Sequence, residues 1–168
     1  MARRIKEAAY LEGDFLLRSG RRSKYYLDKY LFETQPEILA ELGRRLADRA
    51  GAHVDKIAGA ELGAVPLAAA TSMACGKPYV IVRNRKKDYG TSKPIEGQLE
   101  KGEVVMLVED VVTSGGQILE AAKALEEAGA QIERIVAVID RQEGGREKIE
   151  QAGYCSESIL TKTDLRIA

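Results

Sequence analysis

The sequence predicts an α/β fold in which a mostly parallel sheet is flanked by helices on both faces. Short apolar segments that suit buried strands alternate with amphipathic or alanine-rich segments that suit helices. Glycine-containing turns separate these segments, and their spacing favours parallel crossover connections. A chain of 168 residues, 45% of them apolar, is long enough to bury one sizeable core. We therefore expect a single domain over residues 1–168.

The first part of the chain predicts two helices and a strand. Apolar residues recur at helical spacing over about 2–11 and again over about 36–50. Pro36 and Gly51 suit the two ends of the second helix, because proline is accepted in a first turn and glycine often follows a last one. The apolar run KIAGA, residues 56–60, then suits a buried strand.

Strands and helices then alternate to the end of the chain. An alanine-rich helix is expected at 65–74, followed by a strand in PYVIVRN at 78–84. Further strands are expected at 103–110, 134–141 and 156–161, with helices at 117–128 and 146–153 between them. Ligands of such sheets bind beyond the carboxyl ends of the strands, so we expect the functional site there.

Charge and composition argue against several classes of function. Lysine plus arginine equals aspartate plus glutamate, 26 each, so no general field draws the chain to nucleic acid or to a membrane. No apolar run approaches the roughly 18 residues of a membrane span, and the N-terminal residues lack the pattern of a secretory signal. Cys75 and Cys155 lack metal-ligand spacing, and His53 is the single histidine. We expect reduced thiols, a cytoplasmic location and no metal ligand that can be named.

The segment LVEDVVTSGGQ, residues 107–117, carries the strongest chemical signal. Glu109 and Asp110 fall at the carboxyl end of a predicted strand, and residues 111–116 form the turn into the next helix. Small residues, hydroxyls and free amides at a helix start favour a phosphate. The two acids repel a phosphate but accept hydrogen bonds from vicinal hydroxyls. The segment therefore suits a ligand that has both groups, such as ribose 5-phosphate.

Two better-known phosphate motifs are absent from the sequence. No G-x-x-x-x-G-K-[ST] occurs, and no G-x-G-x-x-G follows the first strand, so a P-loop and a dinucleotide fold are disfavoured. A capped strand-to-helix turn with surface acids is the plain structural alternative for residues 107–117. The coincidence of two acids, two hydroxyls and two glycines in this short stretch favours the phosphate site.

The same segment resembles the signature of type I phosphoribosyltransferases, which bind 5-phosphoribosyl 1-diphosphate. Other segments are similar to the orotate phosphoribosyltransferase family in particular, in order and over nearly the whole chain. They are FLLRSGRRSKYYLD at 15–28, VRNRKKDYGTSKPIEG at 82–97, VIDRQEGGREKI at 138–149 and the closing LTKTDL. The resemblance implies transfer of the phosphoribosyl group to orotate, which gives orotidine 5′-monophosphate and diphosphate in pyrimidine biosynthesis.

The resemblance also implies a fold and a set of donor contacts. The fold is that of type I phosphoribosyltransferases, with a base-covering hood from about 1–35 and 155–168. The donor contacts that it implies are Arg83, Asn84, Lys87, Tyr89, Glu109, Asp110, Val111, Val112, Thr113, Ser114, Gly115, Gly116 and Gln117. Lys87, Arg83 and Asp110 take the catalytic roles, since cations aimed at the leaving diphosphate lower the barrier. Mg²⁺ is implied as a diphosphate partner that relies on substrate oxygens and water.

The orotate contacts implied by the resemblance are Thr113, Arg141, Arg18, Tyr25 and Tyr26. A guanidinium such as that of Arg141 suits a carboxylate through two parallel hydrogen bonds. Core packing is the alternative role for one of the two tyrosines, and a surface charge at a strand end is the alternative for Arg141.

The loop at about 84–97 resembles the family's mobile loop, which closes over the neighbouring subunit's site and so implies a homodimer. A solvated run of charges is the alternative for this loop. Leu62, Asn84 and Tyr89 stand where bacterial members often carry lysine, lysine and histidine, and Arg18 also replaces a lysine. These departures leave two alternative functions open. One is a phosphoribosyltransferase for a purine or another base, and the other is a non-catalytic sensor of phosphoribosyl diphosphate.

Overall fold

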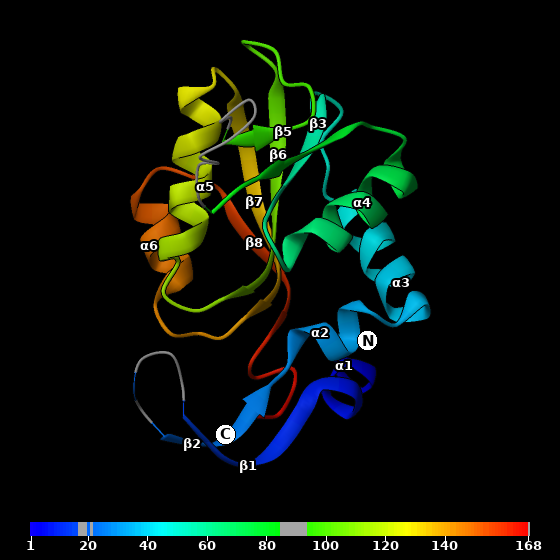
Figure 1. Cartoon of the computed structure of the whole chain (residues 1–168), viewed down its shortest axis with the longest axis vertical. Helices are drawn as coiled ribbons and strands as arrows, with labels where there is room; N and C mark the ends of the chain where they lie inside the picture. Colours follow the sequence, from blue (N-terminus) through cyan, green and yellow to red (C-terminus); the bar gives the residue numbers. More distant parts are fainter. Residues whose placement is uncertain (17–19, 21, 85–93, 168) are drawn as a thin grey trace.

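The computed structural model describes residues 1–16, 20, 22–84 and 94–167 (Figure 1). Its elements follow in the order α1 (Ala2–Ala9), β1 (Tyr10–Leu16), β2 (Arg22–Leu27), α2 (Lys29–Glu33), α3 (Pro36–Ala47), β3 (Lys56–Ala60), α4 (Ala64–Cys75), β4 (Tyr79–Val82), β5 (Ile95–Glu96), β6 (Val104–Val112), α5 (Gly116–Glu127), β7 (Gln131–Asp140), α6 (Gly145–Gln151) and β8 (Ser156–Thr161). The described helices do not include one that is both long and apolar enough to cross a bilayer.

The main sheet has six strands in the order β5-β4-β3-β6-β7-β8. All neighbouring pairs are parallel except that of β5, which pairs antiparallel with β4 at the edge. The chain runs outward from β3 to β5 and then returns to run outward in the other direction from β6 to β8. The crevice between β3 and β6 is therefore the topological switch point, where sheets of this kind bind ligands.

Helices cover both faces of this sheet, with α3 and α4 on one side and α5 and α6 on the other (Figure 1). Met106 of β6 packs in the core that contains Leu67 of α4. Its neighbour Leu107 packs in the second core, with Leu125 of α5. These two adjacent side chains pack in different cores because successive side chains of a strand point to opposite faces of the sheet. The predicted fold class is confirmed.

The predicted strands and helices of the sheet region are all present. The strands at 56–60 and 156–161 have the predicted bounds, and the other elements begin or end within a few residues of them. Two shifts matter for the site. The strand expected at 103–110 continues to Val112, so Glu109 and Asp110 lie inside β6 and the turn shortens to 113–115. The strand expected at 78–84 ends at Val82.

The N-terminal segment differs from the prediction. The first helix ends at Ala9, because Tyr10 adopts an extended conformation with ψ 118° and begins β1. β1 and β2 pair antiparallel as a separate two-stranded sheet, which the sequence did not predict. All of their side chains are exposed or half-buried. β2 alternates between exposed and half-buried side chains, but β1 shows no such alternation, and the sequence of neither strand alternates between apolar and polar residues.

The two ends of the chain lie together beside this hairpin. Lys6 in α1 donates a 2.7 Å hydrogen bond from Nζ to the carbonyl oxygen of Arg166. Leu165 and Ile167 are buried in the same core as Ile5 of α1. Helix α2 follows β2 directly, and the Asp28 side chain caps it by accepting a 3.1 Å hydrogen bond from the amide of Tyr30. The first two contacts hold the N-terminal helix to the residues that follow β8.

Candidate active site

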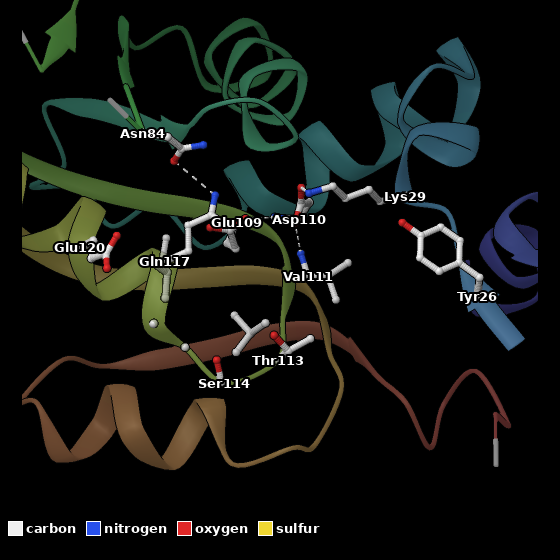
Figure 2. A pocket seen from close by; sticks show the side chains of 14 residues that line it. Tyr26, Lys29, Asn84, Glu109, Asp110, Val111, Thr113, Ser114, Gln117 and Glu120 are labelled. Carbon is white, nitrogen blue, oxygen red and sulfur yellow. Dashed lines mark hydrogen bonds and ion pairs between the residues drawn. The ribbon is translucent and has the colours of Figure 1, made fainter. Parts of the chain in front are cut away.

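A cavity of about 850 Å³ opens at the carboxyl end of β6, beside the switch point. Its lining includes every residue from Glu109 to Ile118, together with Tyr26, Lys29, Asn84 and Glu120 (Figure 2). All the donor contacts expected between residues 109 and 117 therefore lie on one wall. Arg83 and Asn84 line a smaller adjoining pocket of about 140 Å³.

The start of α5 forms the phosphate-sized end of this wall. Gly115 precedes the helix in the left-handed region, with φ 71°, and among the described residues no side chain caps the helix. The first amides of a helix have no partner within it, so they are available to an anion. A Cβ atom at Gly115 would lie 2.9 Å from the carbonyl oxygen of Gly145. Glycine is therefore needed both for the backbone conformation and for this close approach.

Glu109 and Asp110 form the acidic part of the wall, and both are buried, with 5% and 2% exposure. Oε1 of Glu109 accepts a 3.2 Å hydrogen bond from the amide of Asp110, and Oδ1 of Asp110 accepts one from the amide of Val111. Oε2 of Glu109 is buried without a hydrogen-bond partner among the described residues. The site therefore holds a hydrogen-bonding group that no described residue satisfies.

The protonation of Glu109 depends on its surroundings. Burial, followed by the nearby charge of Asp110, raises the pKa of Glu109 well above its ordinary range, although Lys29 acts in the opposite direction. Two adjacent buried carboxyl groups do not both ionise readily, so Glu109 retains its proton more readily than a surface glutamate. A protonated carboxyl group can donate as well as accept a hydrogen bond, which suits contact with hydroxyls.

Lys29 brings a cation from the N-terminal hairpin region to this acidic wall. Its Nζ atom forms an ion pair with Oδ2 of Asp110, and it lies beside that side chain in Figure 2. Burial is the largest single influence and lowers the pKa of Lys29. The charge of Asp110 and its hydrogen bond, together with the charges of Tyr30 and Glu109, outweigh burial, so the pKa is raised overall. The sequence alone did not mark Lys29 as a site residue, because it lies in no phosphate motif and five residues separate it from the S-G-R-x-S segment at 19–23.

Arg83 and Asn84 follow β4, and both contact Glu61 in the turn after β3. The amide nitrogen of Asn84 donates to Oε1 of Glu61 at 2.9 Å, and Asn84 Nδ2 donates to the Glu61 carbonyl oxygen at 2.6 Å. Arg83 lies 3.9 Å from Glu61 and 3.6 Å from Glu96. Nε2 of Gln117 in α5 donates to the Asn84 side-chain oxygen at 3.4 Å, drawn as a dashed line in Figure 2. These contacts join the turn after β3, the end of β4 and the start of α5.

Arg141 follows β7 and faces the hairpin. Its NH2 atom donates to the Tyr25 hydroxyl at 3.1 Å and forms an ion pair with Glu143 at 3.0 Å. Tyr25 also stacks on Tyr10, with ring centroids 5.6 Å apart, and packs against the first core. Tyr26 points the other way and lines the cavity (Figure 2). Arg141 is not among the residues that line this cavity.

Several expected site residues lie outside the part of the chain that the structure describes. They are Arg18, Lys87 and Tyr89. The described site adds residues that motif reasoning missed, namely Lys29, Glu33 and Gly63. Gly63 has a packing role, because a Cβ atom there would overlap Oδ2 of Asp110. Only the topology of the sheet, which brings β3 beside β6, could have revealed that contact.

Known proteins with this architecture were identified by sequence and by structure. Residues 32–165 match the model of the phosphoribosyl transferase domain. An orotate phosphoribosyltransferase of Methanocella arvoryzae is 48% identical over 153 residues, which cover 91% of this chain and 87% of that protein. The crystal structure of orotate phosphoribosyltransferase from Aeropyrum pernix is 32% identical, with a TM-score of 0.85 and coverage of 98% and 96%.

A second solved structure bears on the ligand. It is the orotate phosphoribosyltransferase of Mycobacterium tuberculosis H37Rv in complex with 5-phospho-alpha-D-ribosyl 1-diphosphate, which is 30% identical with a TM-score of 0.82. It covers 99% of this chain and 96% of that one. The sheet order, the acidic wall and the amide-lined turn thus occur in a chain that these relatives match over 91–99% of its length. This chain belongs to the phosphoribosyltransferase family.

Proposed function

We propose that this protein is an orotate phosphoribosyltransferase. It transfers the 5-phosphoribosyl group from phosphoribosyl diphosphate to orotate, giving orotidine 5′-monophosphate and diphosphate. The observation that carries this proposal is the single cavity wall on which Glu109 and Asp110 precede the uncapped start of α5. Acids suit the ribose hydroxyls and amides suit the 5-phosphate, so one wall binds both ends of the same sugar.

The donor is positioned by three groups of residues in this proposal. Residues 113–117 receive the 5-phosphate, and Glu109 and Asp110 receive the ribose hydroxyls. The diphosphate then extends toward the turn after β3, where Arg83 and Asn84 lie. Holding the sugar at both ends fixes its anomeric carbon before the base arrives, which supplies part of the rate enhancement through orientation.

The leaving diphosphate gains negative charge as the bond to the sugar breaks. Arg83 and Lys87 stabilise that charge, and Tyr89 donates a hydrogen bond to the same group. Arg83 lies within 4 Å of two acids, Glu61 and Glu96. The arriving diphosphate competes with these carboxylates for the guanidinium. The additional negative charge that the diphosphate gains in the transition state then strengthens this contact beyond the one made with the substrate.

Mg²⁺ accompanies the diphosphate in this proposal. The described residues contain no cluster of three histidine, cysteine or acidic side chains that could enclose a metal. A bound Mg²⁺ ion would be held mainly by diphosphate oxygens and water. Oε2 of Glu109, which has no hydrogen-bond partner among the described residues, would be able to accept a hydrogen bond from water in this cavity. When bound, the ion neutralises diphosphate charge, and the chain's own residues orient the sugar.

Orotate is bound between the hairpin and β7 in this proposal. Arg141 exchanges the Tyr25 hydroxyl and Glu143 for the orotate carboxylate, and Thr113 contacts the base from the phosphate turn. Tyr26 and Arg18 cover the ring from the hairpin side. The contacts between the ends of the chain support assignment of about 1–35 and 155–168 as a hood over the base.

We also propose that the enzyme is a cytoplasmic homodimer in which the loop at 84–97 covers the partner's site. Mixing the Lys87→Ala and Arg141→Ala variants tests this arrangement. If the loop crosses to the partner, each mixed dimer carries one native site and one site that lacks both residues. About half of the dimers in an equal mixture are mixed, so activity returns to about one quarter of the native level. No recovery in a mixture shown to exchange subunits contradicts a shared site.

A panel of bases tests the reaction itself. The protein is incubated with phosphoribosyl diphosphate, Mg²⁺ and each of orotate, uracil, adenine, hypoxanthine and xanthine, and diphosphate release is measured. Turnover with orotate alone is expected, because Arg141 suits an acidic base. Turnover only with a purine overturns the substrate assignment. Donor binding without turnover on any base overturns the enzymatic assignment and favours a sensor of the donor.

A further inference from the structure

The ion pair between Lys29 and Asp110 occupies the place where the ribose is expected. The Asp110 side chain is 3% exposed and that of Lys29 is 31% exposed, so the pair reaches from the cavity surface into the acidic wall. Asp110 cannot present Oδ2 to a ribose hydroxyl without sharing or losing this contact. Binding of the sugar therefore requires that the ammonium group of Lys29 either remain beside the ligand or move.

The space around this pair is tightly limited. A Cβ atom at Gly63 would overlap Oδ2 of Asp110 and lie 2.8 Å from Nζ of Lys29. The turn after β3 therefore packs directly against the ion pair. Little room remains for Lys29 and a ribose hydroxyl on the same oxygen, so movement of Lys29 is favoured over sharing.

Glu33 offers a second partner one helical turn beyond Lys29. It is 1% exposed, and neither of its carboxylate oxygens has a hydrogen-bond partner among the described residues. Residues i and i+4 of a helix lie about 5–6 Å apart at Cβ, so Lys29 and Glu33 project from the same side of α2. A buried carboxyl group without a partner is costly, and a fold that retains one calls for a reason.

Charges around Glu33 agree with this arrangement. Burial, followed by the charge of Asp110, raises the pKa of Glu33 to about 8, with Asp28 acting in the same direction and Lys29 against it. A ribose hydroxyl that donates a hydrogen bond to Asp110 takes the place of Lys29 on that carboxylate. The attraction of Lys29 to Glu33 then exceeds its attraction to Asp110. Glu33 then releases its proton to solvent, and the resulting carboxylate pairs with the ammonium group.

We propose that Lys29 is a positioning residue with two partners, which holds Asp110 in the free enzyme and transfers to Glu33 when the ribose of the donor binds. This inference rests on the proposed function, because it assumes that Asp110 binds the ribose. It assigns a role in donor binding to α2, whose sequence carries no phosphate motif. Neither residue touches the reacting bond, so their effect is on donor affinity.

Binding of phosphoribosyl diphosphate with Mg²⁺, measured by calorimetry, tests the proposal without any base. Lys29→Met is expected to weaken donor binding by about tenfold or more and to leave orotate binding unchanged, with partial rescue in Lys29→Arg. Glu33→Gln is expected to weaken donor binding several-fold while the free protein becomes as stable as the native one or more so. A purely structural role for Glu33 would change stability and leave donor affinity unchanged, which would overturn the proposal.

The chain supplies a matched control. Lys123 and Glu127 form the same i, i+4 pair on α5, 3.8 Å apart, with side chains 76% and 68% exposed. Lys123→Met and Glu127→Gln should leave donor affinity unchanged. A structure with bound donor in which Nζ of Lys29 remains on Asp110 also contradicts the transfer. If the native protein binds the donor but turns over no base, the proposed function is overturned and this inference is not. If the native protein turns over orotate but the Lys29 variants keep native donor affinity, this inference is overturned and the proposed function is not.

Discussion

The amide nitrogen of Asn84 donates a 2.9 Å hydrogen bond to Oε1 of Glu61, 23 residues away along the chain. Glu61 thereby fixes the point at which the loop after β4 leaves the sheet. Glu61→Ala is expected to lower kcat/KM for the donor by about tenfold, because Arg83 and Asn84 lose a fixed orientation toward the diphosphate. Steady-state kinetics with varied donor measures this effect. An unchanged kcat/KM contradicts the role, and Glu127→Ala on α5 is the control.

Lys87→Ala is expected to lower kcat by roughly 10²–10³-fold, because a cation aimed at the leaving diphosphate acts mainly in the transition state. Orotate affinity, measured by calorimetry, should stay within about twofold of the native value. Comparable loss of ground-state orotate binding, with kcat retained, would refute the assignment of the loop as a catalytic lid. Lys123→Ala removes an exposed lysine and serves as the control.

Arg141→Ala is expected to weaken orotate binding by about 10–100-fold, because a carboxylate loses a charge-assisted pair of hydrogen bonds. Lysine cannot reproduce the planar, two-pronged geometry, so Arg141→Lys should recover only part of the affinity. Tyr25→Phe removes the hydroxyl that accepts a 3.1 Å hydrogen bond from Arg141 and should have a smaller effect. Titration of each variant with orotate distinguishes these cases. An unaltered donor KM is the internal control.

Gly115→Ala combines two costs, a left-handed backbone with φ 71° and a Cβ atom 2.9 Å from the carbonyl oxygen of Gly145. Gly153→Ala has only the first cost, because its φ is 95° and no heavy atom lies within 4 Å of the added Cβ. Gly153→Ala should lower the free energy of unfolding by about 1–2 kcal/mol, and Gly115→Ala by more. Donor affinity should fall in Gly115→Ala alone. Equal effects of the two substitutions would indicate that the turn has no special geometry.

Stability should depend on pH through Glu33. The pKa of Glu33 is about 8 in the folded protein, against an ordinary value of 4.5 that applies to the unfolded chain. Between pH 4.5 and about 8 the folded state therefore binds more protons than the unfolded state. The contribution of protonated Glu33 is complete below pH 4.5 and is lost as the pH rises to about 8. Glu33→Gln should flatten this part of the profile. Free energies of unfolding by urea across that window test it, and parallel profiles for both proteins would show that Glu33 does not titrate there.

The sheet and the phosphate turn could be predicted because their sequence signals are local. Apolar runs such as KIAGA bury both faces of a strand, and the acids, hydroxyls and glycines of the turn are adjacent in the chain. The hairpin could not be predicted because its side chains are all exposed or half-buried and its sequence does not alternate between apolar and polar residues. Lys29 and Glu33 could not be assigned because their importance depends on Asp110, which lies far along the chain and meets them only in the folded protein.

The parallel pairing of β3 with β6, with Ile57 opposite Met106, has a consequence for how the enzyme acquires activity. Everything that is proposed to hold the diphosphate precedes β6, and everything that is proposed to hold the sugar and its phosphate belongs to β6 or follows it. Closing this non-local pair is the slow kind of step in folding, since the entropy of closing a long loop is lost before the strand contacts form. A nascent or cleaved chain that lacks either half is expected to lose one set of donor contacts, so donor binding can report that the two halves have joined.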